Sequence, residues 1–79
     1  MLIQRLEDLR IDNDKTQQQI ADMLCCTRGV YRRYEKGERA LPIWALEKLA
    51  VFYGVSTDYI LGLTNDPRPY AREVKNRTA

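Results

Sequence analysis

Apolar residues in this chain recur three or four positions apart, and no stretch of strand length alternates apolar with polar residues. Leu2, Leu6 and Leu9 show this spacing near the N-terminus, and residues 43–53 show it again. Residues at this spacing fall on one face of an α-helix, whereas a half-buried strand needs a period of two. The pattern therefore predicts an all-α fold.

Polar turns, glycines and capping residues divide this pattern into short segments. Thr16 and Gln19 have the spacing of a capping box, Thr27 is a second N-cap residue, and Gly37 and Gly54 can each end a helix. These signals predict five helices, at residues 2–11, 17–24, 27–36, 42–53 and 57–61. Because the connections between them are short, the helices are expected to form one compact domain.

The length of 79 residues suits a single small domain. A polar stretch containing two prolines follows residue 63, so residues 1–63 are expected to form the domain. Residues 64–79 are expected to be a polar, basic tail, with a short extra helix as the alternative. No apolar run reaches the roughly 18–20 residues of a membrane span, and no signal-peptide pattern precedes the first helix. A cytoplasmic protein with no membrane partner is therefore expected.

Two adjacent cysteines, Cys25 and Cys26, raise the question of a metal or redox site. Neighbouring Cα atoms lie about 3.8 Å apart, below the roughly 4.4–6.8 Å that is usual for a disulfide. A closed zinc site needs about four cysteine or histidine ligands, and the chain has no histidine and two cysteines. We therefore interpret Cys26 as a small core residue and Cys25 as a turn residue, and we expect no metal site.

Positive charge is concentrated after the cysteines. The formal net charge of +2 indicates no particular partner. However, residues 28–39 contain five basic and two acidic residues, whereas residues 1–26 contain three basic and five acidic ones. A local cationic segment of this kind is typical of a surface that meets a polyanion.

The helices expected at 17–24 and 27–36 have the dimensions of a helix-turn-helix. Helical spacing places Arg28 and Arg32 on the outward side of the second helix and Glu35 on its inward side. A charged helix face is often only solvated, and charge alone leaves that alternative open. Arg28, however, would stand at the first helical position, where a cation opposes the helix dipole. This placement favours a functional role for the outward face.

The stretch from Thr16 to Gly37 reads TQQQIADMLCCTRGVYRRYEKG. It resembles the helix-turn-helix of the lambda-repressor and Cro family, also called the xenobiotic-response-element (XRE) family. The common pattern of that family is T-Q-x-x-L-A-x-x-L-G-V-S-x-x-x-I-x-x-Y/W-E-x-G. Residues 49–62, LAVFYGVSTDYILG, are also typical of these domains. The resemblance covers residues 3–63 and implies a compact five-helix, lambda-repressor-like DNA-binding domain, with helices two and three forming the helix-turn-helix.

The resemblance also implies which residues meet double-stranded DNA. The third helix, Thr27–Lys36, would lie in the major groove, where arginine pairs well with guanine O6 and N7. The base-reading positions would be Arg28, Gly29, Arg32 and Arg33. Contacts to the DNA backbone would come from Gln17, Thr27, Lys36, Arg39 and the start of the fourth helix at Ile43 and Trp44. Arg10 and Glu35 would form a structural ion pair.

Three residues depart from the family pattern or are ambiguous within it. Cys25 stands where the family usually has glycine, at a turn position that tends to be left-handed, which costs a non-glycine residue about 1–2 kcal/mol. Gly29 offers no side chain at a position where the family often reads a base. Trp44 falls beside the core stripe of its helix and is expected to be partly exposed. Its place beside the DNA backbone, across a dimer interface or simply half-buried stays open. For these reasons no operator sequence can be transferred from the family.

These observations predict a sequence-specific, repressor-like transcriptional regulator that binds a palindromic operator as a homodimer. Its origin would be bacterial or phage, and it would be nucleoid-associated when bound. The alternative is a protein-interaction module on the same fold, such as an antitoxin-like partner. An enzyme is disfavoured, because the chain has no histidine, no glycine-rich phosphate loop and no nucleophile beside a plausible base. No cofactor and no small-molecule ligand are expected.

Overall fold

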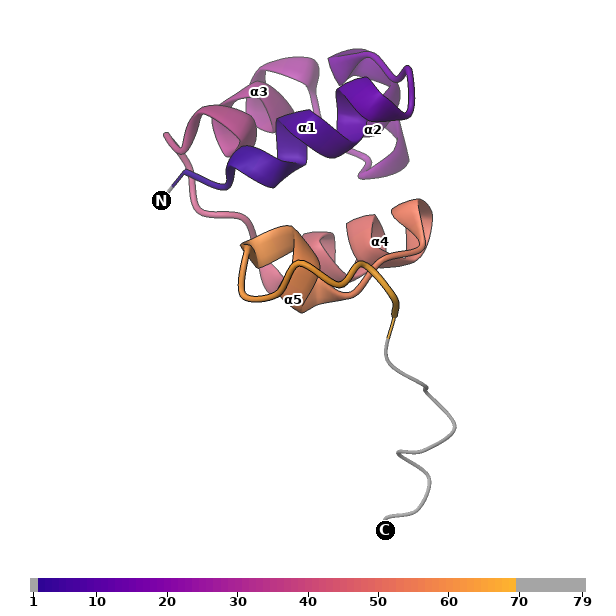
Figure 1. The fold of residues 1–79 in the computed structure, drawn as a ribbon. Helices are drawn as coiled ribbons and strands as arrows, with labels where there is room; N and C mark the ends of the chain where they lie inside the picture. The colour runs from indigo at the N-terminus through magenta and orange to yellow at the C-terminus, as the bar shows by residue number, and fades with distance from the viewer. Residues whose placement is uncertain (1, 70–79) are drawn as a thin grey trace, which may run out of the picture.

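The computed structural model describes residues 2–69, and these residues form helices and loops (Figure 1). In chain order the helices are α1 (Gln4–Asp12), α2 (Gln17–Met23), α3 (Arg28–Lys36), α4 (Ile43–Tyr53) and α5 (Thr57–Leu61). Within the described residues no strand accompanies them. The all-α prediction, with five helices, is therefore confirmed.

The starts of α2 and α3 are set by the side-chain caps that the sequence predicts. The Gln19 amide N–H donates to Thr16 Oγ1 at 3.1 Å, and the Thr16 N–H donates to Gln19 Oε1 at 2.8 Å, so the capping box is complete. Thr27 Oγ1 accepts a bond from the Val30 N–H at 3.2 Å and thereby caps α3. These local bonds fix where α2 and α3 begin.

The N-terminal helix differs from the prediction at both ends. It begins at Gln4 and not at residue 2, because the preceding Ile3 has a non-helical backbone, with φ −111° and ψ 87°, and Leu2 lies exposed outside the helix. At the other end α1 continues to Asp12, and Asp14 then takes a left-handed φ of 56°. An aspartate tolerates this conformation better than most residues, and it turns the chain sharply into α2.

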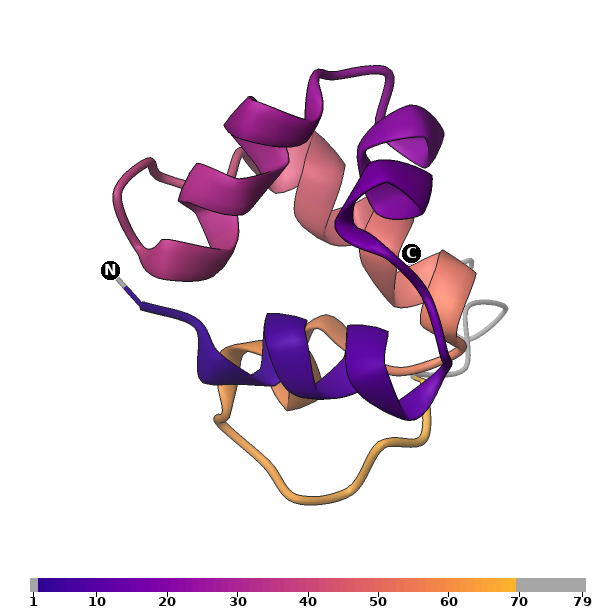
Figure 2. The same cartoon turned by 90° about the horizontal axis from the view of Figure 1, so that it is seen from above.

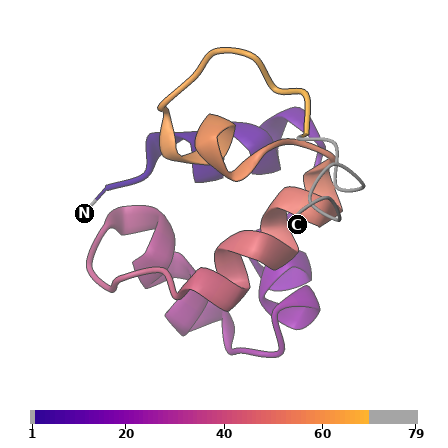
Figure 3. The same cartoon turned by 90° about the horizontal axis from the view of Figure 1, so that it is seen from below.

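The helices form two groups around one core. α1 and α5 lie side by side, whereas α2 and α3 lie together on the other side of the molecule (Figure 2). α4 contacts α5 and crosses the molecule between the two groups (Figure 3). The buried apolar residues come from every helix and adjoining loops: Ile3, Leu6, Leu9, Ile20, Ala21, Leu24, Tyr31, Tyr34, Ala45, Leu49, Ala50, Val55 and Ile60. This shared core holds the helix-turn-helix in place.

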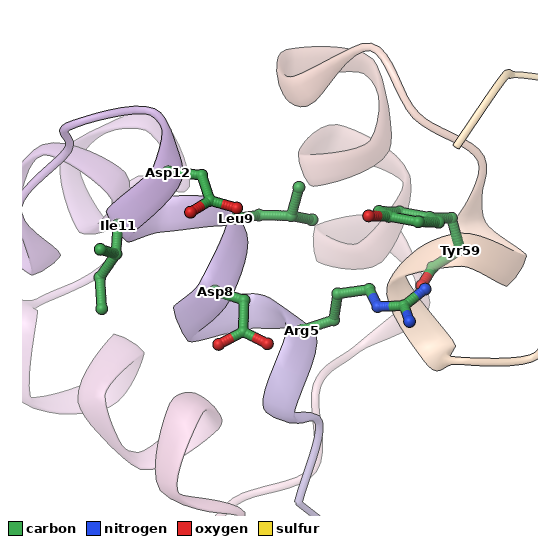
Figure 4. A pocket seen from close by; sticks show the side chains of 6 residues that line it. All are labelled: Arg5, Asp8, Leu9, Ile11, Asp12 and Tyr59. Carbon is green, nitrogen blue, oxygen red and sulfur yellow. The ribbon is translucent and has the colours of Figure 1, made fainter. Parts of the chain in front are cut away.

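Residues 64–69 run along the domain through contacts with Arg5 and Ser56. Arg5 Nη1 donates to the carbonyls of Tyr59 and Thr64, each at 2.9 Å, and its guanidinium lies 4.1 Å from the centre of the Tyr59 ring (Figure 4). The Ser56 N–H donates to the Pro67 carbonyl at 3.1 Å. Residues 64–69 are non-helical and attached to the domain. The remaining part of the expected tail, residues 70–79, lies outside the described residues.

The helices of the described chain are all too short and insufficiently apolar to cross a lipid bilayer.

Candidate nucleic-acid interface

The turn between α2 and α3 brings the two helices into close contact. Ala21 is completely buried where the helices meet, and its carbonyl accepts a bond from the Cys26 N–H at 2.9 Å. Cys25 has a left-handed φ of 59°, as its family position predicts. Cys25 is exposed and Cys26 is half-buried, and both are free thiols. Burial raises the pKa of the Cys26 thiol, which keeps it protonated and suits a packing role.

The inner face of α3 is anchored by a buried carboxylate. Glu35 is 4% exposed, and Arg10 Nε donates to its Oε2 at 2.6 Å. Arg10 Nη2 and Gln17 Nε2 both donate to Oε1 of Glu35, at 3.4 and 3.2 Å. Arg10 and Glu35 thus form the ion pair expected from the sequence, and the carboxylate joins α1, α2 and α3.

Two tyrosine hydroxyls complete this polar cluster. Burial, together with the nearby Glu35 carboxylate, raises the pKa of Tyr31 above its ordinary value and that of Tyr53 to about 12. Tyr31 faces Glu35, but neither hydroxyl makes a hydrogen bond of good geometry with a described residue. Burial acts to raise the pKa of Glu35, but hydrogen bonds from Arg10 and Gln17, together with the facing Tyr31 hydroxyl, outweigh it, so the pKa of Glu35 is lowered. The carboxylate is therefore charged at neutral pH.

The outer face of the same helix is cationic and exposed. Arg28, Arg32 and Arg33 are all exposed, as are Gly29 and Lys36. Within residues 2–69 none of the three arginines forms an ion pair with a carboxylate. Arg28 is the first helical residue, after the N-cap Thr27, so its charge does oppose the helix dipole. The four positions expected to read bases lie together on this face.

The residues expected to contact the DNA backbone surround α3. Lys36 and Arg39 are exposed at its C-terminal end. α4 begins at Ile43 with no side-chain cap, so the amides of Ile43 and Trp44 open an uncapped helix. Gln17 also has a partner inside the protein, because its side-chain Nε2 donates to the buried Glu35. One N–H of that side-chain amide is left to donate to a phosphate.

The structure adds two residues that sequence reasoning missed at the start of α2. A hollow of about 620 Å³ is lined by Arg10, Lys15, Thr16, Gln17, Gln18 and Arg28. Lys15 and Gln18 bring a cation and an amide to the same hollow as Arg28. Their sequence signal was weak, because a lysine in a polar turn and a glutamine in a run of three are common surface residues.

A hollow on the α1–α5 side has a different chemistry. Its volume is about 330 Å³, and Asp8 and Asp12 line it beside Arg5 and Tyr59 (Figure 4). Arg5 is already engaged with the Tyr59 and Thr64 carbonyls. Two carboxylates at this surface disfavour a polyanion, so the cationic face of α3 is the better candidate interface.

This arrangement can be compared with known proteins. The family model for helix-turn-helix domains matches residues 6–60, which include the capped α2, the turn and α3. The chain belongs to the XRE-type helix-turn-helix family. The lambda-repressor-like, five-helix fold agrees with that membership.

The curated relatives are named as transcriptional regulators or repressors. An uncharacterized HTH-type transcriptional regulator, YobD of Bacillus subtilis (strain 168), is 42% identical over 69 residues, covering 87% of this chain and 62% of YobD. The cryptic phage CTXphi transcriptional repressor RstR of Vibrio cholerae is 36% identical over 55 residues, covering 70% of this chain and 50% of RstR. The chain thus spans between half and two thirds of the length of these two relatives. No solved structure gives a significant match.

Proposed function

We propose that this helix-turn-helix protein is a sequence-specific, repressor-like transcriptional regulator that binds double-stranded DNA. In this proposal α3 lies in the major groove, and Arg28, Arg32 and Arg33 read base edges. Two copies bind the two halves of a palindromic operator, because one recognition helix covers only a few base pairs. The names of the relatives YobD and RstR support the regulatory role.

The observation that carries the proposal is the division of α3 into two faces. Three arginines without carboxylate partners among the described residues project from the outer face, while Tyr31, Tyr34 and Glu35 bury the inner face. An arginine guanidinium pairs with guanine O6 and N7, and each good pair contributes about 1–3 kcal/mol of discrimination. Gly29 removes a side chain from the centre of this face, which leaves the readout to the arginines.

Phosphate contacts would orient α3 without reading sequence. Lys36 and Arg39 supply charge at one end of α3, and the uncapped amides of Ile43 and Trp44 supply donors beside them. At the other end, the hollow that contains Lys15 and Gln18 would receive a second phosphate. Thr27, which precedes the lining residue Arg28 in the chain, would offer its hydroxyl as a further donor.

Selection of bound duplexes from a random DNA pool at near-physiological salt tests the proposal. A two-fold symmetric site with guanines in each half is expected. Retention without enrichment, lost steeply as salt is added, would mean that the protein holds phosphates alone. Absence of retention would contradict the proposal.

An antitoxin-like interaction module is the second candidate, and the exposed apolar residues of α4 favour it. Trp44 is 50% exposed and Val51 is 66% exposed. The double variant Arg28→Ala/Arg33→Ala separates the two candidates. A regulator would lose DNA binding in this variant, whereas an interaction module would still capture its protein partner.

A further inference from the structure

The outward side of α4 is apolar and remains uncovered by the other described elements. Its inward side is already buried through Ala45, Leu49 and Ala50. Its outward side exposes Trp44 and Val51 to solvent. A helix that is apolar on opposite sides is usually buried on both. The outward side of α4 therefore has the character of an interaction surface.

This side is hollowed and extends onto the end of α2. A groove of about 670 Å³ is lined by six residues, which we call the α4 surface: Met23, Trp44, Glu47, Lys48, Val51 and Phe52. Lys48 Nζ donates to the Met23 carbonyl at 3.5 Å, so the end of α2 and the middle of α4 are joined. Seen from below, α4 lies between α2 and α3 on one side and the paired α1 and α5 on the other (Figure 3).

Four residues of the α4 surface form a pattern that is complementary to itself. Trp44, Glu47, Lys48 and Val51 are three, one and three positions apart and so share one helix face. Apolar residues stand at the two ends and opposite charges stand in the middle. In two antiparallel copies of the helix related by a two-fold axis, residues whose numbers have the same sum lie opposite each other. Positions 44 and 51, and positions 47 and 48, both add to 95. The apolar residues therefore face each other, and so do the opposite charges.

We propose that the α4 surface binds a second copy of this chain in an antiparallel, two-fold contact. This inference rests on the proposed function, since it names the surface through which two copies read one operator. Trp44 packs against the partner's Val51, and Glu47 faces the partner's Lys48. The symmetry repeats both contacts, as in any isologous dimer. A parallel arrangement is disfavoured, because it would place Glu47 against Glu47 of the partner subunit.

The contact is small and is therefore expected to be weak. A helix of eleven residues is about 16 Å long, and its one face offers less than the roughly 800 Å² per partner of a standard interface. Two copies bound to adjacent half-sites have a high effective concentration for each other. The surface would then contribute mainly as cooperativity between half-sites.

The charged centre of the surface allows a swap experiment on the full chain. Glu47→Lys places like charges together at both symmetric positions, and we expect the dimer dissociation constant to rise about tenfold or more. The double variant Glu47→Lys/Lys48→Glu restores the complementarity and should return it close to the original value. Asp12→Lys is the matched control, because it makes the same change of charge on an exposed residue of α1. Sedimentation equilibrium over a concentration series gives the constants, and circular dichroism checks the fold.

Binding to duplexes with one or two half-sites separates this inference from the proposed function. We expect Glu47→Lys to lose cooperative binding to two half-sites while it still binds one half-site. The inference would be overturned if the original chain stayed monomeric on two-half-site DNA, or if Glu47→Lys dimerised as well as Asp12→Lys. It would also be overturned if the double variant failed to regain dimerisation. If the original chain failed to bind even a single half-site, the result would instead contradict the proposed function.

Discussion

The two faces of α3 differ in both burial and charge. The inner face buries Tyr31, Tyr34 and Glu35, and Glu35 bonds to Arg10 and Gln17. The outer face exposes its arginines, and within the described residues none of them pairs with a carboxylate. Within one turn of helix, the buried and hydrogen-bonded Glu35 carboxylate thus lies close to exposed arginines that pair with no carboxylate of the described residues.

The comparison predicts that stability and recognition depend on different residues of the same nine-residue helix. Changes on the inner face should alter the free energy of unfolding, and changes on the outer face should alter DNA affinity. Variants on each side can show whether this division holds.

Arg10→Met should have the largest effect on stability. It leaves the Glu35 carboxylate buried without its main partner, which is expected to lower the free energy of unfolding by about 3–5 kcal/mol. Urea denaturation followed by circular dichroism measures the loss. The double variant Arg10→Met/Glu35→Leu removes both charges and should be less destabilised than Arg10→Met alone. Equal or greater destabilisation would mean that the ion pair is not the main anchor of α3.

The pH dependence of stability should report the same pair. The pKa of Glu35 is lowered in the folded state, so the carboxylate stabilises the fold above its ordinary pKa of about 4.3. This contribution should disappear as the pH falls below that value through the folded-state pKa. Melting temperatures between pH 3 and 7 would show the fall. The double variant Arg10→Met/Glu35→Leu should show a smaller fall, and an identical acid profile would exclude Glu35 as its source.

Arg33→Ala should affect recognition and leave stability almost unchanged. Loss of one bidentate contact to guanine is expected to weaken binding to the selected site by about 1–3 kcal/mol. Fluorescence anisotropy with the selected duplex and with a scrambled duplex gives the two affinities. If both affinities fell equally, Arg33 would contact phosphate and not a base.

Cys25→Gly should stabilise the turn between α2 and α3. Cys25 has a φ of 59°, and glycine adopts this conformation without the penalty of about 1–2 kcal/mol. A higher melting temperature is expected in a thermal scan. Cys26→Ala serves as the comparison at a neighbouring thiol. An unchanged or lower melting temperature for Cys25→Gly would contradict strain at Cys25.

Arg28→Ala should give a small gain in stability together with a loss of DNA affinity. Removal of a cation from the first helical position is expected to raise the free energy of unfolding by about 0.3–1 kcal/mol. DNA affinity should fall in the same variant. Urea denaturation and anisotropy on one protein preparation provide both numbers. A loss of both stability and affinity would mean that Arg28 also supports the fold.

Much of the fold followed from local sequence signals. The capping box at Thr16 and Gln19 and the cap at Thr27 depend on a few neighbouring residues, and the structure contains both. The left-handed Cys25 was expected through the family resemblance, and the structure contains it as well. The predicted start of α1 was wrong, because Leu2 matches the helical spacing of the core leucines although it is exposed. Spacing alone does not distinguish a leucine that packs from one that precedes the helix.

Contacts between segments that are distant in the sequence were harder to predict, both for the site and for the fold. The Arg10–Glu35 pair was expected only through the family resemblance, and the hydroxyl of Tyr53 beside it was not expected at all. Arg5 binds the Thr64 carbonyl across 59 residues, and no local pattern indicates that bond. The base-reading and backbone-contacting residues stay predictions, because their partners are on the DNA.

Nuclear magnetic resonance of the full chain, with its backbone and arginine side chains labelled with nitrogen-15, tests the central claim most directly. During titration with the selected duplex, we expect the largest shifts at the side chains of Arg28, Arg32 and Arg33 and at the amides of residues 27–36. Asp8 and Asp12 on α1 should be unaffected. Large shifts around Asp8 and Asp12, with the α3 arginines unchanged, would contradict the assignment of recognition to the outer face of α3.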